Sequence, residues 1–298
     1  MSVSRRRAAA VCVAVAFVLL AVRNSDADVR ATDDTGAAVT LVSPAQRIVS
    51  LAPHATELLF AAGAGPRIVG AMSGSDFPPA AAQLPIVGTA TALDLEHILA
   101  LRPDLIVTWP YTTPMQVDVL RGQGIPVFTT NPRTIDDIAR DIERLGALAD
   151  TSATAREAAR RFRSRLAVLA ANAAGKIAVR VFYQVSDVPL YTVGGNHLIT
   201  HALALCGAQN IFASLALPAP EISVEAVLAA RPDAIVAGTA GAIAPSWLAE
   251  WKRWRDIPAV RGNRLFVVDA NLLHRPGPRF VDGVQQLCDV VERARDSM

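Results

Sequence analysis

Residues 93–107 read LDLEHILALRPDLIV, and residues 222–236 read ISVEAVLAARPDAIV. Eight of the fifteen aligned positions are identical, at a constant offset of 129 residues. In each copy a capping Asp or Ser precedes a short amphipathic pattern, which predicts a helix. Pro103 or Pro232 then ends that helix, and the apolar run that follows predicts a buried strand. The sequence therefore contains two copies of one helix–turn–strand unit, which predicts two similar lobes.

The rest of the chain supports an α/β fold class. Short β-branched runs predict strands at 47–51, 67–70 and 85–88, and a helix is expected at 55–63, ending at Gly63. The second half repeats this alternation of strands and helices. Strands that alternate with helices favour a parallel sheet covered on both faces.

One segment breaks the alternation. Residues 134–175 contain no strand candidate, and their second part has apolar residues at helical spacing. We therefore expect one long rigid helix to join the lobes, since a flexible linker would carry Gly, Ser or Pro. The predicted divisions are a signal peptide at 1–27, an N-terminal lobe at 28–146, a linking helix at 147–175 and a C-terminal lobe at 176–298.

The N-terminus predicts export. Arg5, Arg6 and Arg7 precede fifteen uncharged residues from Ala8 to Val22, which suits a secretory signal and is short for a bilayer span of ~20 residues. An uncleaved anchor is the alternative. Removing residues 1–27 takes four Arg and one Asp from 29 basic and 27 acidic residues, so the remainder carries a formal charge of −1. Nothing in that balance supports nucleic-acid binding.

Two cysteines remain after the signal, Cys206 and Cys288. An even pair in an oxidising compartment predicts a disulfide, whereas two separate buried thiols are the alternative.

Catalytic and metal-binding motifs are weak. His197 and His201 are four residues apart, but zinc-protease chemistry needs a Glu directly after the first His, and Leu198 stands there. The chain also has no Gly-x-Ser-x-Gly motif, no phosphate loop and no Gly-x-Gly-x-x-Gly after a strand, so we do not expect an enzyme. The five histidines are dispersed, so we expect no metal site, and no cofactor is expected.

Glu96 and Glu225 occupy the same place in the two copies of the repeat. A carboxylate in the first helical turn is stabilised by the helix dipole, by ~0.3–1 kcal/mol, and that alone would explain both residues. The other interpretation is that two lobes present matching acidic residues to a partner that itself has two-fold symmetry.

Several motifs together carry a family resemblance. RIVSLAPHATELLFAAG, SDFPP, the first repeat, GAQNIF and RPGPR…QQLC resemble the periplasmic cobalamin-binding proteins of ABC importers, over about residues 46–291. This is the binding-protein class with a rigid helical backbone, class III. The resemblance implies a monomer that captures a corrinoid between its lobes with little lobe movement. It also implies that Glu96 and Glu225 dock on arginines of a dimeric permease in the inner membrane.

A ligand between the lobes should touch loops at the carboxyl ends of the strands. Aromatic side chains there would stack on a flat macrocycle, and the resemblance implies polar contacts from the loop after the last strand. The candidate ligand-binding residues are His54, Phe77, Trp109, Tyr111, Tyr183, Asn271 and Arg275.

The chain also departs from the family pattern. Gly74, Ala90 and Ala219 are small where the family has aromatic residues. A smaller or differently substituted corrinoid would fit these changes. A haem or ferric-siderophore binding protein of the same fold is the main alternative, and a transition-metal-ion binding protein is a weaker one.

Overall fold

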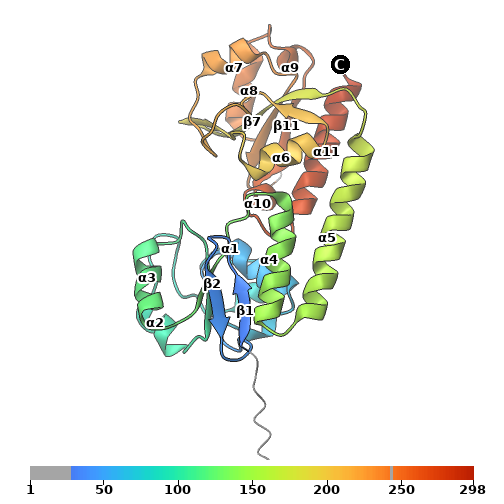
Figure 1. Ribbon diagram of the computed structural model, residues 1–298. Coiled ribbons are helices and arrows are strands. Elements are labelled where there is room, and N and C mark those ends of the chain that lie inside the picture. Colours follow the sequence, from blue (N-terminus) through green and yellow to red (C-terminus); the bar gives the residue numbers. More distant parts are fainter. Residues whose placement is uncertain (1–27, 242–243) are drawn as a thin grey trace, which may run out of the picture.

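A computed structural model describes residues 28–241 and 244–298. Two α/β lobes lie one above the other, and a long helix, α5 (Ser152–Ala173), runs along one side of both (Figure 1). At ~1.5 Å per residue this helix is about 33 Å long, so it can span the junction of the lobes. The predicted signal peptide at 1–27 lies outside the described residues.

The N-terminal lobe is built on a four-stranded parallel sheet in the order β4-β3-β5-β6. An antiparallel hairpin of β1 and β2 precedes this sheet in the chain. The strands are β1 (Val29–Thr32), β2 (Ala38–Leu41), β3 (Ile48–Ser50), β4 (Ile68–Ala71), β5 (Leu105–Thr108) and β6 (Val127–Thr129); the α-helices are α1 (Pro53–Ala61), α2 (Leu95–Ala100), α3 (Pro114–Gly122) and α4 (Ile135–Leu148), with 3₁₀ turns η1 (Gly65–Arg67) and η2 (Pro79–Gln83).

The C-terminal lobe has a five-stranded sheet in the order β11-β10-β7-β8, with β9 paired to β7. β8 runs antiparallel to β7, so this sheet is mixed rather than purely parallel as predicted. Its strands are β7 (Val179–Asp187), β8 (Leu190–Thr192), β9 (Ala208–Asn210), β10 (Ala234–Thr239) and β11 (Leu265–Asp269); the helices are α6 (Leu198–Leu205), α7 (Val224–Ala230), α8 (Ser246–Glu250), the 3₁₀ turn η3 (Trp251–Arg253), α9 (Pro258–Arg261), α10 (Ala270–Leu273) and α11 (Phe280–Asp296).

The repeated phrase forms the same unit in each lobe. Asp94 caps α2 by accepting from the His97 N–H at 2.9 Å, and Ser223 caps α7 by accepting from the Ala226 N–H at 3.2 Å. Each helix is followed by an Arg whose backbone is in the left-handed region, with φ of 47° at Arg102 and 46° at Arg231.

The Asp of each RPD turn ties its unit to the neighbouring strand. Asp104 accepts from the Arg47 N–H at 2.9 Å, and Asp233 accepts from the Arg180 N–H at 3.0 Å. In return, the Arg47 guanidinium donates to the Leu101 carbonyl oxygen at the end of α2. Arg180 does the same for the Ala230 carbonyl oxygen at the end of α7. These reciprocal bonds account for the Asp that both copies of the phrase share.

Two predicted boundaries change in the structure. The segment at 85–88 is not a strand: Ile86 makes only an isolated bridge to Ala71, and Pro85 has no N–H to extend a ladder. The long helix begins at Ser152 rather than 147, because α4 continues to Leu148 and a turn at Asp150, with φ 50°, separates the two helices.

One apolar cluster is common to both lobes, and each lobe has a second cluster of its own. A single cluster of buried side chains runs from Ile48 of β3 through Phe162 of α5 to Val284 of α11. An ion pair of 2.7 Å between Arg165 and Asp282 also joins α5 to α11. Within the described ranges, no helix combines the length and apolar character needed to cross a bilayer.

A polar network fastens the β1–β2 hairpin beside α4. Asp34 accepts from the Asn131 N–H at 2.6 Å and pairs with Arg144 at 2.7 Å. Arg144 also pairs at 3.1 Å with Asp141, whose side chain is fully buried. Burial, together with the nearby charge of Asp34, raises the pKa of Asp141 to about 8, against the opposing hydrogen bond from Thr130.

This raised pKa predicts a pH-dependent stability. The folded protein keeps the Asp141 proton up to about pH 8, whereas the unfolded chain releases it near the ordinary value of 3.8. Stability should therefore fall as the pH rises from about 4 to about 8, because the folded state binds the proton more strongly. Asp141→Asn should flatten this dependence. The difference in melting temperature between the variant and the wild type should be about 2–4 °C more favourable to the variant at pH 9 than at pH 5. An unchanged pH profile in thermal unfolding, compared with the exposed control Asp256→Asn, would contradict this assignment.

Candidate functional site

The candidate site lies where loops of the two lobes meet. In each sheet, the carboxyl ends of the parallel strands share one edge. The N-terminal lobe contributes α1 and the loop after β4, and the C-terminal lobe contributes the segment between α10 and α11. We call the side chains that meet there the interlobe cluster: Glu57, Asp76, Phe77, Arg275 and Arg279.

A buried carboxylate is the centre of the interlobe cluster. The Glu57 side chain is 1% exposed, and Arg279 donates to both of its oxygens, from Nε at 2.9 Å and from Nη2 at 2.6 Å. These bonds raise the pKa of Arg279 above its ordinary value. Gly277 lies against the same carboxylate, where a Cβ would be 3.3 Å from Oε2. The pair joins the two lobes through a bidentate contact that fixes both distance and orientation.

The second arginine is shared between two acids. Arg275 donates to Asp76 at 2.5 Å and lies 3.8 Å from Glu57. The hydrogen bond from Arg275 lowers the pKa of Asp76. Arg279 also places its guanidinium 4.1 Å from the centre of the Phe77 ring. Two cations and two anions therefore neutralise one another at this edge of the site.

Aromatic side chains line the N-terminal side. The Trp109 ring, directly after β5, contacts Tyr111 with centroids 4.7 Å apart. Tyr111 is 69% exposed and Phe77 is 38% exposed, so both rings present apolar surface to solvent. Trp109 and Tyr111 therefore form one aromatic pair, whereas Phe77 contacts Arg279 in the interlobe cluster.

His54 lies beneath the aromatic residues, in the first turn of α1. Its ring meets Trp109 edge to face, with centroids 5.3 Å apart, and the residue is 3% exposed. Its Nε2 atom is buried without a hydrogen-bond partner among the described residues. Burial, and then the nearby charge of Arg275, lower its pKa from 6.5 to about 3. His54 is therefore neutral at physiological pH.

Two other predicted contact residues lie differently. Tyr183 was expected at the cleft, but its side chain is fully buried, and its hydroxyl is 3.1 Å from Nε2 of His274. It packs so closely on Gly238 that a Cβ there would be 2.2 Å from the hydroxyl. The assignment of Tyr183 to the ligand surface is therefore wrong for this structure. Asn271 is half-buried in α10, next to the cluster in sequence.

Glu96 and Glu225 are exposed and are not part of the interlobe cluster. Each occupies the first turn of its helix, α2 or α7. The two helices lie on the side of the molecule opposite α5, one in each lobe (Figure 1). Among the described residues, neither carboxylate forms an ion pair.

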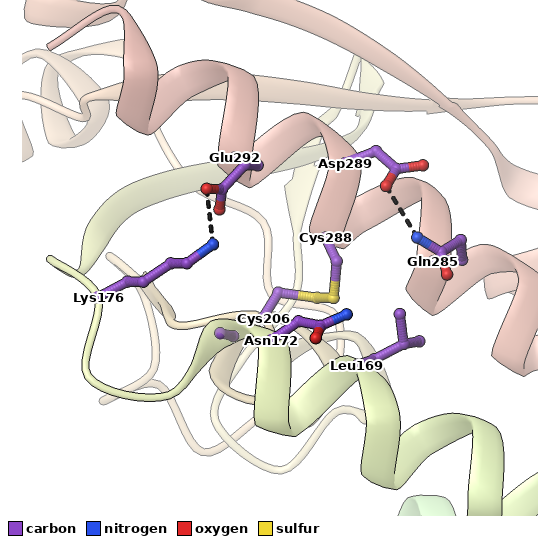
Figure 2. A pocket seen from close by; sticks show the side chains of 9 residues that line it. Leu169, Asn172, Lys176, Cys206, Gln285, Cys288, Asp289 and Glu292 are labelled. Atoms are coloured by element: carbon purple, nitrogen blue, oxygen red, sulfur yellow. Dashed lines mark hydrogen bonds and ion pairs between the residues drawn. A yellow bond between two sulfur atoms is a disulfide. The ribbon is translucent and has the colours of Figure 1, made fainter.

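The disulfide prediction is confirmed. Cys206, at the end of α6, is bonded to Cys288 of α11. The bond borders a cavity of about 320 Å³, where Lys176 pairs with Glu292 at 2.7 Å and the Gln285 amide donates to Asp289 at 2.8 Å (Figure 2). This cavity lies along α5 and the second half of α11, away from the interlobe cluster. In the described part of the chain, no group of three or more His, Cys, Asp or Glu side chains is arranged to hold a metal ion.

Comparison with known proteins identifies the family. A family described as periplasmic binding proteins matches residues 48–272. A vitamin B12-binding protein of Vibrio parahaemolyticus is 34% identical over 253 residues, which covers 85% of this chain and 91% of the relative. The chain belongs to the periplasmic binding protein family.

Solved structures of this family share the fold. The crystal structure of a periplasmic vitamin B12 binding protein of Vibrio cholerae is 36% identical, with a TM-score of 0.76, and covers 84% of this chain and 98% of that one. A periplasmic heme-binding protein of Roseiflexus is 25% identical, with a TM-score of 0.71, and covers 84% and 99%. The expected class of fold is confirmed, and the family places this chain among solute-binding proteins rather than enzymes.

Sequence reasoning missed the acidic half of the interlobe cluster. Glu57 is the single acidic residue of α1, where it lies among mostly apolar residues, and that isolation was the available signal. Asp76 stands within the motif SDFPP, but nothing local indicates that it pairs with Arg275, 199 residues later.

The Glu57–Arg279 pair should contribute strongly to stability. Replacing Glu57 by Gln leaves a partly buried guanidinium without its anion. We expect a loss of about 2–4 kcal/mol in the free energy of unfolding, below the ~3–5 of a fully buried pair because Arg279 keeps some exposure. Urea denaturation measures this difference. Glu157→Gln, which breaks an exposed pair on α5, should change little, and equal effects of the two variants would contradict the role given to Glu57.

Proposed function

We propose that the protein is the solute-binding component of an ABC importer and that it captures cobalamin or a related corrinoid between its lobes. The observation that carries this proposal is the similarity to vitamin B12-binding proteins over 85% of the chain. The corrinoid is cargo rather than a cofactor, and the protein does no chemistry on it.

The charge of the site supports a corrinoid over an anionic ligand. Corrinoid side chains are mostly neutral amides, which need hydrogen bonds and apolar walls. Arg275 and Arg279 are both neutralised by acids, so the site offers little net positive charge. Phe77, Trp109 and Tyr111 supply the walls, and Asn271 and Arg275 lie where polar contacts are proposed.

Haem or a ferric siderophore is the second candidate. The similarity to a heme-binding protein of Roseiflexus favours it. Carboxylates on such a ligand would have to displace Asp76 or Glu57 from the arginines, which costs part of the binding energy. A bare transition-metal ion is the weakest candidate, because it needs several protein ligands.

Docking on the importer is proposed to use Glu96 and Glu225. Both carboxylates are exposed at equivalent positions of equivalent units, so they can meet the two copies of a dimeric permease in the same way. The protein would act as a monomer in the periplasm after removal of residues 1–27. The continuous core and α5 favour a small movement of the lobes on binding.

Ligand identity is tested by isothermal titration of the mature chain, from Asp28, with cyanocobalamin, cobinamide, haem and a ferric hydroxamate. Submicromolar binding of a corrinoid is expected. Binding of haem or the hydroxamate alone would overturn the proposed ligand, while leaving the fold and the docking surface unaffected.

Reversing the charge of both docking residues should separate transport from binding. Glu96→Arg together with Glu225→Arg should abolish uptake in cells that depend on this importer, because like charges would meet at the permease. Ligand affinity should stay within about twofold. Glu157→Arg on α5 is the matched control. A fall in affinity, or normal uptake by the double variant, would refute the docking assignment.

A further inference from the structure

The Cys206–Cys288 disulfide borders an open cavity that the proposed function does not use. The cavity, of about 320 Å³, lies between the end of α5 and the second half of α11 (Figure 2). Four of the side chains around it are exposed, so it opens to solvent: Asn172, Lys176, Gln285 and Asp289. A cavity of this size is at the lower end of the range for small-molecule sites, ~300–1,000 Å³.

The two residues of the disulfide differ in their access to this cavity. Cys206 is 1% exposed and belongs to the apolar cluster that is common to both lobes. Cys288 is half-buried and packs against that cluster from its edge. Exchange between a thiol and a disulfide requires access to the sulfur that is attacked. An incoming thiol therefore reaches Cys288 rather than Cys206.

The surroundings of Cys206 suit the sulfur that is released. Its Sγ atom lies 3.6 Å from the Val284 carbonyl oxygen, which can accept a hydrogen bond from the thiol once the disulfide opens. Cys206 also follows the last turn of α6, where the negative end of the helix dipole disfavours a thiolate. Burial in apolar surroundings has the same effect. The released Cys206 is therefore a protonated thiol.

The position of α11 does not depend on the disulfide alone. Val284, Leu287 and Val291 of this helix are fully buried in the apolar cluster common to both lobes. These contacts hold α11 in place when the bond between the sulfur atoms opens. Exchange can therefore take place in the folded protein.

Lys176 places a positive charge in the wall of the same cavity. It pairs with Glu292 at 2.7 Å, and both side chains remain partly exposed. The attacking species in exchange is a thiolate, so a cation beside its path favours its approach. The charge of Lys176 therefore affects how fast an anion reaches Cys288.

We propose that Cys288 is a reversible modification site for small thiols, which enter this cavity and form a mixed disulfide with it. The attacking thiolate forms a bond to Cys288 Sγ, the bond to Cys206 breaks, and its electron pair stays on Cys206 Sγ, which takes a proton from water. Return of the Cys206 thiolate to Cys288 expels the small thiol and restores the original bond. Exchange conserves the number of disulfide bonds, so it needs no other oxidant or reductant. The inference does not depend on the ligand that the lobes bind.

The first test uses the mature protein, from Asp28, with its disulfide intact. The folded protein is incubated with excess reduced glutathione, quenched with acid, and labelled with N-ethylmaleimide in denaturant. Mass spectrometry of peptides should place glutathione on Cys288 and the maleimide on Cys206, with at least about tenfold less of the reverse product. Glutathione mainly on Cys206, or a product that forms only after unfolding, would overturn the proposal.

Two single-cysteine variants measure the same difference directly. Cys206→Ser leaves Cys288 as the single thiol of the mature chain, and Cys288→Ser leaves Cys206. In the folded state, oxidised glutathione should modify Cys206→Ser at least about 100-fold faster than Cys288→Ser, because a buried thiol reacts only through local opening. In denaturant the two rates should be alike, and circular dichroism reports whether each variant is folded. Equal rates in the folded state would refute the role of Cys288.

A change of charge tests entry through the cavity. Lys176→Met, added to Cys206→Ser, should slow the reaction with oxidised glutathione by about threefold or more, because the anionic reagent loses a favourable charge. Lys252→Met removes the other lysine of the chain and is the matched control. Its rate should equal that of Cys206→Ser alone. Equal rates for the two lysine variants would contradict entry beside Lys176.

Discussion

The contact of Glu57 with the two arginines is the constraint on which the site depends. Burying a carboxylate to 1% exposure is costly unless paired groups offset the loss of water, and the two arginines that do so come from the other lobe. The spacing of the lobes at the interlobe cluster is therefore set by the length of an Arg side chain. Gly277 contributes by letting the backbone approach the carboxylate closely.

The local features of the fold could be predicted, because local chemistry determines them. Capping residues, Pro103 and Pro232, and the apolar runs indicate the repeated unit, and its strands and helices lie where expected. The disulfide also followed from a simple argument, since two cysteines remained for an exported chain. The isolated bridge at Ile86 and the antiparallel β8 were missed, because pairing direction depends on strands distant in sequence.

The site itself was predicted less well, because its contacts join residues that are far apart in the sequence. The aromatic residues near Trp109 are close in sequence, and a strand end predicts their place. The ion pair of Glu57 with Arg279 joins residues 222 positions apart, so no window of sequence contains it. Tyr183 shows the opposite error: it looked like a cleft residue, but the absence of a side chain at Gly238 creates room for it inside the lobe.

The disulfide has a consequence for where the protein matures. It closes a loop of 82 residues within the C-terminal lobe, and a constraint of that length removes about 4–5 kcal/mol of unfolded-chain entropy on the simplest account. On the proposed export route, thiols remain reduced before the chain crosses the membrane, so this contribution would be available only on the oxidising side. On that route a newly made chain would be easier to keep unfolded during translocation, and the C-terminal helix, which begins next to Arg279, would be cross-linked only afterwards.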